Sequence, residues 1–280
     1  MKPLDRLPSA NTREILIKVD LVAKILFATI ATLALLGISS AMVQTAFPDL
    51  HLAAFTEEFD LHGENNIPTY FSSLLLLAVS IVALGLALSE SVTLDRYYYV
   101  GIAVLFLVLS IDEVASLHER LNRPIRGITG NYSWFRFAWV IPGAVLVGVV
   151  GIAYYRFVRR MPDLPRRLTF IAGALFVGGA LGLELLEGKL ASTVKPEYRD
   201  SGYYFANHAL VITEELMEML GAALFVVALL LILRRRKELR LIFLGRVERE
   251  NTSKCYAREP DLEETSNQGW HESERGYANV

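Results

Sequence analysis

Apolar residues recur along the chain in six long blocks, which polar and charged segments separate. A window of about 19 residues places these blocks near 21–46, 67–89, 97–119, 136–157, 168–188 and 206–233. The hydrocarbon core of a bilayer is about 30 Å thick, and each block is long enough to cross it as an α-helix. The pattern therefore predicts an all-α, polytopic membrane protein with six transmembrane helices.

Positive charge is shared unequally between the segments that flank these blocks. Seventeen lysines and arginines lie in the first, third, fifth and last segments, the last counted up to Arg246, whereas six lie in the segments between them. Cytoplasmic segments of membrane proteins are enriched in Lys and Arg, so both termini are predicted to be cytoplasmic. We expect the protein to be a multi-pass protein of a bacterial plasma (inner) membrane.

The chain is predicted to divide into a transmembrane domain, 1–246, and a polar cytoplasmic tail, 247–280. The tail is rich in acids and lacks a periodic apolar face, which is typical of disordered segments. Its Cys255 is the single cysteine of the chain, which excludes an intrachain disulfide and a multi-cysteine metal site. No basic stripe of the kind that binds nucleic acid is present.

The most informative polar residues are acids placed within or at the edge of three of the apolar blocks. A charged side chain at the bilayer centre costs roughly 2.5 to 3.5 kcal/mol, so such acids usually face a protein interior and mark a functional path or site. The predicted topology puts all of them toward the outer side of the membrane. They are Asp112, Glu113, Glu119, Glu184, Glu187, Glu214, Glu215 and Glu218.

Helical geometry predicts which of these acids share a face. On the third helix, Asp112, Ser116 and Glu119 form one stripe, and on the sixth helix His208 and Glu215 form another. If the two helices pack antiparallel, the stripes line one cavity. Few positive charges lie nearby, so these carboxyl groups cannot all stay ionised on their own. Some must therefore be protonated, or the site must bind a cation.

Histidine and carboxylate side chains on several helices of a bundle are the ligands that divalent zinc, iron or manganese accepts. Soluble di-iron bundles use Glu-x-x-His pairs, and this spacing is absent here, as is His-Glu-x-x-His. We nevertheless predict a divalent metal site, with Glu218 and Glu119 as the acid–base residues. The predicted metal ligands are Asp112, Glu184, Glu215, His208 and His118.

Such a site predicts a membrane metalloenzyme, a hydrolase or an oxidoreductase, that acts on a lipid, a lipid-linked substrate or another small molecule. A proton-coupled or cation transporter is the first alternative, because buried acids can exchange a proton for a cation. The second alternative is a structural or sensory membrane protein in which the acids pair with nearby basic groups.

Overall fold

The computed structural model describes residues 18–46, 52–129, 136–199 and 201–235. The described residues all belong to one compact unit, Glu14–Lys237. The predicted tail, 247–280, lies outside them. The helices in chain order are α1 (Val19–Ala46), α2 (Ala53–Glu58), α3 (Ile67–Leu88), α4 (Thr93–Ala115), α5 (Leu117–Thr129), α6 (Val140–Arg159), α7 (Asp163–Val177), the π-helix η2 (Gly178–Leu183), α8 (Glu184–Thr193), the short 3₁₀ helix η3 (Pro196–Tyr198) and α9 (Ser201–Arg235).

Six helical segments of the described part are long and apolar enough to cross a membrane, which confirms the predicted fold class. They are α1, α3, α4, α6, the continuous run α7–η2–α8, and α9. The chain is therefore a multi-pass membrane protein. The cytoplasmic location of both termini stays a prediction, as does the bacterial plasma membrane.

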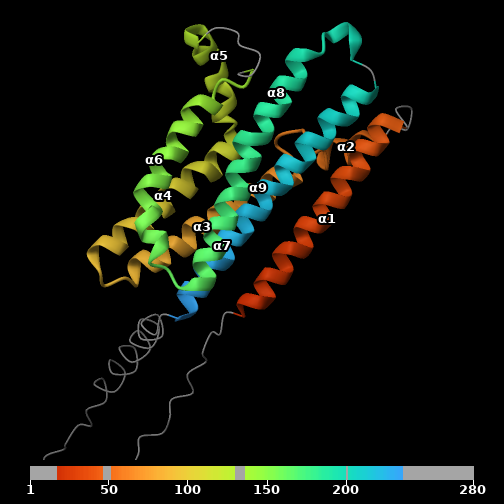
Figure 1. Ribbon diagram of the computed structural model, residues 1–280. Helices are drawn as coiled ribbons and strands as arrows, with labels where there is room; N and C mark the ends of the chain where they lie inside the picture. The colour runs from red at the N-terminus through yellow and green to blue at the C-terminus, as the bar shows by residue number, and fades with distance from the viewer. Residues whose placement is uncertain (1–17, 47–51, 130–135, 200, 236–280) are drawn as a thin grey trace, which may run out of the picture. The chain divides into compact units, whose positions relative to one another are not determined.

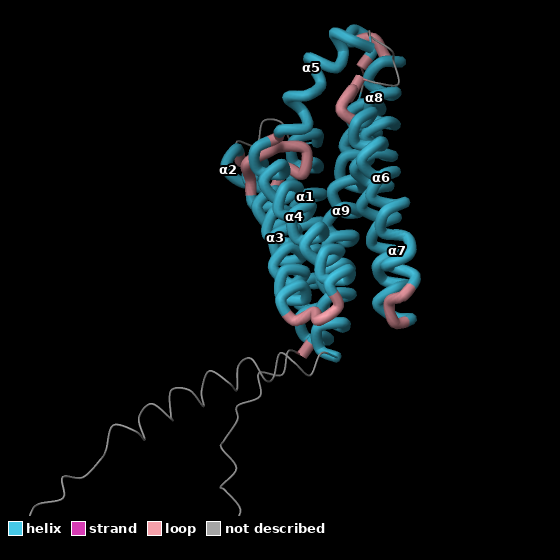
Figure 2. The backbone as a smooth tube through the Cα atoms, turned by 90° about the vertical axis from the view of Figure 1, so that its left-hand side faces the viewer, coloured by secondary structure: helices cyan, strands magenta, loops and turns pink. Residues whose placement is uncertain are grey.

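Helix α9 is the centre of the bundle. It packs against α1, α3, α7 and η2, while α3 and α4 form a closely packed antiparallel pair. Figure 2 shows α3 and α4 on one side of α9 and α6 and α7 on the other. Val79 and Ala83 of α3 and Met219 and Ala223 of α9 are fully buried in the apolar core.

Serine hydroxyls tie α3 to α4 within the apolar part of the bundle. Ser80 Oγ donates to the carbonyl oxygen of Ala103 at 2.7 Å, and Ser73 Oγ donates to that of Ser110 at 2.8 Å. A hydroxyl in a lipid-facing bundle has no water to bond, so small polar side chains hydrogen-bond between helices instead. These bonds fix the register of the wall that carries Asp112 and Glu113.

The start of α3 follows a sequence signal for a helix N-terminus. Asn66 caps the helix, its side-chain oxygen accepting from the backbone N–H of Thr69 at 3.1 Å, and proline stands at position 68 in the first turn. The preceding Asn65 has a φ of 57°. The short segment from Gly63 to Asn66 therefore turns sharply and brings Glu64 to the end of α4.

The third transmembrane helix ends earlier than its apolar pattern predicts. Ser116 adopts a left-handed conformation with φ 49°, and its N–H donates to the carbonyl oxygen of Asp112 at 2.7 Å, which closes α4 at Ala115. The Ser116 hydroxyl donates to a carboxylate oxygen of Glu64. The prediction that Asp112, Ser116 and Glu119 form one helical stripe is therefore wrong, because Glu119 belongs to α5.

Glycines let the fifth span approach α9 closely. A Cβ on Gly179 of η2 would lie 3.0 Å from the carbonyl oxygen of Glu214, and one on Gly178 would lie 3.0 Å from Met217 Cε. Gly182 lies four residues after Gly178, but nothing lies within 4 Å of an added Cβ there. A π-helical turn widens the backbone locally and is frequent at functional sites. Here it lies directly before Glu184 and against the acids of α9.

We expect Gly221→Ala to destabilise the bundle, because the added Cβ would lie 2.8 Å from the backbone nitrogen of Phe176 and 2.9 Å from the carbonyl oxygen of Ala172. Overpacking of this kind costs about 1–3 kcal/mol. The measurement is the apparent melting temperature of the purified protein in detergent, which should fall by several degrees. Gly85→Ala is the matched control, since nothing lies within 4 Å of its Cβ. Equal melting temperatures for the two variants would contradict the close approach of α7 and α9.

Candidate functional site

A cavity of about 1340 Å³ lies between α3, α4 and α5 on one side and α6 to α9 on the other. All eight acids singled out from the sequence line it, and Glu64 joins them. The convergence of acids from separate spans on one cavity is therefore confirmed. Their individual roles as metal ligands or acid–base residues stay predictions.

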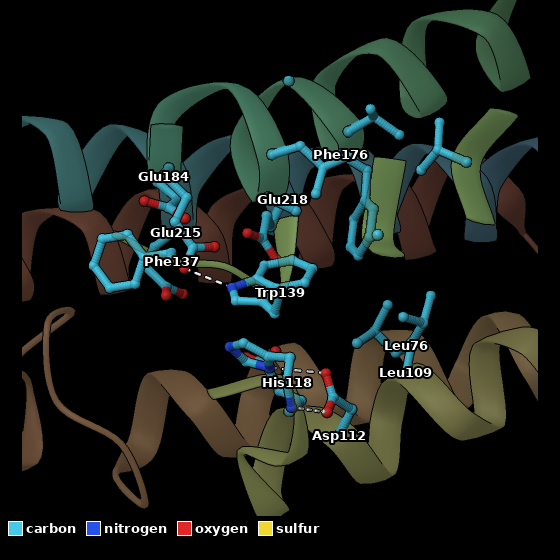
Figure 3. A pocket seen from close by; sticks show the side chains of 18 of the residues that line it. Leu76, Leu109, Asp112, His118, Phe137, Trp139, Phe176, Glu184, Glu215 and Glu218 are labelled. Carbon is cyan, nitrogen blue, oxygen red and sulfur yellow. Dashed lines mark hydrogen bonds and ion pairs between the residues drawn. The ribbon is translucent and has the colours of Figure 1, made fainter. Parts of the chain in front are cut away.

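The rest of the lining is apolar, so the cavity is amphipathic. Leu76 of α3, Leu109 of α4 and Phe176 of α7 lie to one side of the carboxyl groups, as Figure 3 shows. The apolar part continues along the bundle between Phe225 and Leu229 of α9 and the facing side of α6. One end of the cavity is thus suited to a polar group and the other to a hydrocarbon chain.

Asp112 and His118 form a hydrogen-bonded pair across the turn between α4 and α5. Asp112 Oδ2 lies 2.9 Å from His118 Nδ1, and Asp112 Oδ1 accepts from the His118 backbone N–H at 2.9 Å. Burial lowers the pKa of His118, but the hydrogen bond to Asp112 and its negative charge outweigh burial, so the pKa is raised above its ordinary value. The pair therefore favours an imidazolium held against a carboxylate.

Trp139 links this pair to the opposite wall. Its indole Nε1 donates to Glu184 Oε1 at 2.6 Å, and its ring centroid lies 4.8 Å from that of His118. Its backbone N–H donates to Asn122 Oδ1 of α5 at 3.1 Å. In Figure 3 the indole lies between His118 and the carboxyl groups of Glu184 and Glu218. The sequence analysis did not single out Trp139, because its position at the start of an apolar block resembles that of an ordinary interfacial tryptophan.

The acids of α9 lie in the middle part of that helix. The helix has 35 residues, so it is about 52 Å long, well beyond the roughly 30 Å of the hydrocarbon core. Glu214, Glu215 and Glu218 begin about 20 Å from its N-terminal end and are half-buried. Glu184 is 8% exposed and is the most buried acid of the cavity by surface area. These carboxyl groups face each other across a space that lipid tails cannot solvate.

The predicted metal ligands all line the cavity, but they are engaged in different interactions. Asp112 bonds His118, Glu184 bonds Trp139, and His208 lies edge-on against His62 with ring centroids 6.2 Å apart. Within the described ranges, no group of three or more His, Cys, Asp or Glu side chains is arranged to hold a metal ion. Metal binding stays a prediction, and it would need the facing side chains to close around the ion.

The Asp112–His118 pair has an arrangement that is compatible with acid–base chemistry. A carboxylate bonded to one imidazole nitrogen fixes the orientation of the ring and leaves the other nitrogen to exchange a proton with a bound molecule. Figure 3 shows the His118 ring between Asp112 and the acids of α8 and α9. Glu119, a predicted acid–base residue, is exposed and lines the outer rim, whereas Glu218 lies deeper.

We expect the Asp112–His118 pair to stabilise the protein at low pH and to lose this effect as the pH rises. The pKa of His118 in the folded state lies above the unfolded value, which is about 6.5. Its stabilisation is therefore complete below that value and disappears as the pH passes the raised folded value. The measurement is the melting temperature of the wild type and of His118→Gln between pH 5.5 and 9. The wild type should exceed the variant by a few degrees at the acid end only, and a difference that is constant with pH would contradict the charged pair.

Comparison with known proteins places the chain by its sequence. Searches of curated proteins and of solved structures gave no match. Residues 25–233, which include all six spans apart from the ends of the first and last, match the model of a family described as a domain of unknown function, DUF8692. Because this match covers well over half of the chain, the protein belongs to the DUF8692 family.

Proposed function

We propose that this protein binds an amphiphilic molecule of the membrane in its cavity and acts on the head group by acid–base chemistry. The observation that carries the proposal is the lining of one continuous cavity, which changes from carboxyl and imidazole groups to aliphatic and aromatic side chains. A lipid has the same two-part character. Its head group would lie beside His118 and Glu184, and its chain beside Leu76, Leu109 and Phe176.

The size of the cavity supports a lipid-sized ligand. Its volume of about 1340 Å³ exceeds the 300–1000 Å³ that is usual for small-molecule pockets. Each methylene group that leaves water for an apolar lining contributes roughly 0.8 kcal/mol. A membrane lipid already has its chain in hydrocarbon, so the apolar lining serves to admit the chain without penalty. Discrimination between lipids then rests with the polar end.

The packing of α6 supports access from the bilayer. Only 11% of its apolar window is buried inside the structure, the lowest value of the six spans. Leu146 and Val147 of α6 line the cavity and are 48% and 37% exposed. The wall at α6 is therefore one helix thick and loosely held, which suits lateral passage of a lipid chain.

The charge of the polar end favours particular head groups. Nine carboxyl groups line the described cavity against three arginines. A head group that carries an amine or several hydroxyl donors can satisfy such carboxyl groups. Glu218 or Glu119, as a carboxylate, would accept a proton from an attacking water while the water oxygen forms a bond to the ester carbon or phosphorus of the head group. The ester bond would break, and His118, held as an imidazolium by Asp112, would donate a proton to the oxygen that leaves. A hydrolase acting on a lipid fits this arrangement without further groups.

A metal-dependent form of the same reaction remains a second proposal. A divalent zinc, iron or manganese ion between Asp112, His118, Glu184 and Glu215 would polarise a head-group oxygen, with His208 as a further ligand. Ion transport is less well supported. The part of the described lining that lies away from the carboxyl groups has few polar side chains that could pass an ion across the membrane. The structural or sensory alternative leaves the amphipathic cavity without a role.

The cavity can be filled without touching its polar end. Gly151 and Gly148 are both on α6, nothing lies within 4 Å of either added Cβ, and of the two Gly151 alone lines the cavity. We expect Gly151→Phe to occupy the space of the lipid chain and to abolish retention of lipid, whereas Gly148→Phe should retain it. The measurement is native mass spectrometry of protein extracted from membranes in a neutral maltoside detergent. A wild type that carries no lipid-sized adduct, or a Gly151→Phe variant that carries the wild-type adduct, would overturn the proposal.

Metal content separates the two forms of the reaction. The metal form predicts a stoichiometric divalent ion in purified protein at neutral pH and its loss in Glu215→Ala. The measurement is elemental mass spectrometry, with Glu197→Ala as a control acid outside the cavity lining. A wild type without stoichiometric metal that still retains its lipid would leave the metal-free form and exclude the other.

A further inference from the structure

Three arginines from three separate segments line the outer part of the cavity, and the acid–base chemistry above does not use them. They are Arg126 of α5, Arg136 before α6 and Arg199 before α9. We propose that they form an anion subsite that binds a terminal phosphate on the head group of the amphiphile. This inference rests on the proposed function and narrows its ligand to a lipid phosphomonoester.

Arg136 and Arg199 approach the same face of α8. A Cβ on Gly188 would lie 3.3 Å from Arg136 Cβ, so Arg136 packs directly on that residue. Arg199 Nη2 donates to the carbonyl oxygen of Ala191 at 3.0 Å. Gly188 and Ala191 are three residues apart, which puts them on one face of the helix and about 4.5 Å apart along its axis.

Arg126 faces the same region from α5. Asn122, one turn earlier on that helix, accepts a hydrogen bond from the backbone N–H of Trp139. Residues four apart share a helix face, so Arg126 continues outward along the face that contacts the start of α6. Arg136 precedes Trp139 by three residues. The three arginines therefore line the same end of the cavity from α5 and from the segments that precede α6 and α9.

Two of these arginines have a buried donor that the described residues do not satisfy. The Nε atoms of Arg126 and Arg199 are buried and have no hydrogen-bond partner within the described residues. None of the three takes part in an ion pair within 4.0 Å in the same part of the chain. A buried donor without a partner is costly, and phosphate oxygens match the fork of a guanidinium group. An anionic ligand would satisfy these donors.

The order of the apolar, carboxyl and arginine side chains along the cavity defines the class of ligand. Along α8, Gly188 lies one turn outward from Glu184 and Ala191 lies almost two turns outward, which is about 6 to 10 Å. A ligand that fits from the apolar end outward has a hydrocarbon chain, then hydroxyl, ester or amino groups beside the carboxyl groups, and then a phosphate. Lipids with a glycerol or amino-alcohol backbone and a terminal phosphate have this order, whereas a lipid whose amine lies outside its phosphate does not.

The test compares two lipids that differ only in the phosphate. Monopalmitoyl lysophosphatidate and monopalmitoylglycerol are titrated into the full-length protein in a neutral maltoside detergent, and binding is read by native mass spectrometry. The variants are Arg126→Gln/Arg136→Gln and the triple change that adds Arg199→Gln. The matched control changes Arg120, Arg123 and Lys195 to Gln, which removes the same charge from the same outer segments at positions outside the cavity lining.

We expect the triple variant to bind lysophosphatidate at least tenfold more weakly than the wild type and monopalmitoylglycerol within twofold of it. The double variant should show a smaller loss, which guards against misfolding through the lost Arg199–Ala191 bond. Unchanged lysophosphatidate binding in both variants, or an equal loss in the charge control, would overturn the phosphate subsite. If neither lipid binds the wild type, the proposed function itself fails.

Inorganic phosphate distinguishes a lipid source from a free one. Added at millimolar concentration, it should leave lysophosphatidate binding within twofold if the chain supplies most of the affinity. Displacement of the lipid by inorganic phosphate, in an arginine-dependent manner, would show that the subsite takes a free anion and would overturn its assignment to a lipid.

Discussion

Carboxyl groups within a membrane-spanning bundle must be kept out of the hydrocarbon, and most of the architecture of this protein follows from that constraint. Four helical segments carry these groups, and each turns them toward one shared space rather than toward lipid. A group of like charges cannot persist in a dry interior without protons, cations or hydrogen-bond donors. The bundle therefore needs an open, partly polar cavity, and its helices are packed so as to leave one.

Close helix packing elsewhere stabilises the bundle and offsets the packing contacts that are lost at this cavity. Small residues bring α7 and η2 against α9, with Gly221 and Gly179 at the narrowest points, and serine bonds join α3 to α4. These tight contacts form two firm walls. The loosely packed α6 covers the space between them, so the bundle combines a rigid acid-bearing frame with a thin side that borders the bilayer. Such a division of roles suits a protein that takes its ligand from the membrane.

Much of the fold could be predicted because hydrophobic block length reports membrane spans directly. The convergence of the acids could also be predicted, since alternating helix direction puts the ends of the third and fifth spans beside the start of the sixth. The Asp112–His118 pair could not be predicted, because two residues six positions apart on a continuous helix point in different directions and do not contact each other. It arises from the left-handed Ser116, which no periodic pattern marks. Trp139 and the three arginines were missed for a related reason, as they lie at the ends of the spans or between them, where the course of the chain depends on tertiary packing.

Sequence reasoning also assigned a metal site from residue types alone, whereas the described side chains hold each other in pairs. The Asp112–His118 and Trp139–Glu184 hydrogen bonds use carboxylate oxygens and an imidazole nitrogen that would otherwise be available to a metal. The choice between these uses of the same residues depends on what occupies the cavity. A lipid with a polar backbone is compatible with the pairs as they stand.

An experimental density map of the detergent-extracted protein, obtained by electron cryomicroscopy, tests the amphipathic cavity most directly. We expect elongated density between Leu76, Leu109 and Phe176 that ends in a compact head group beside His118 and Glu184. A cavity closed by side chains, or acids of α4, α8 and α9 that face the surrounding lipid, would contradict the convergence on which the proposed function depends.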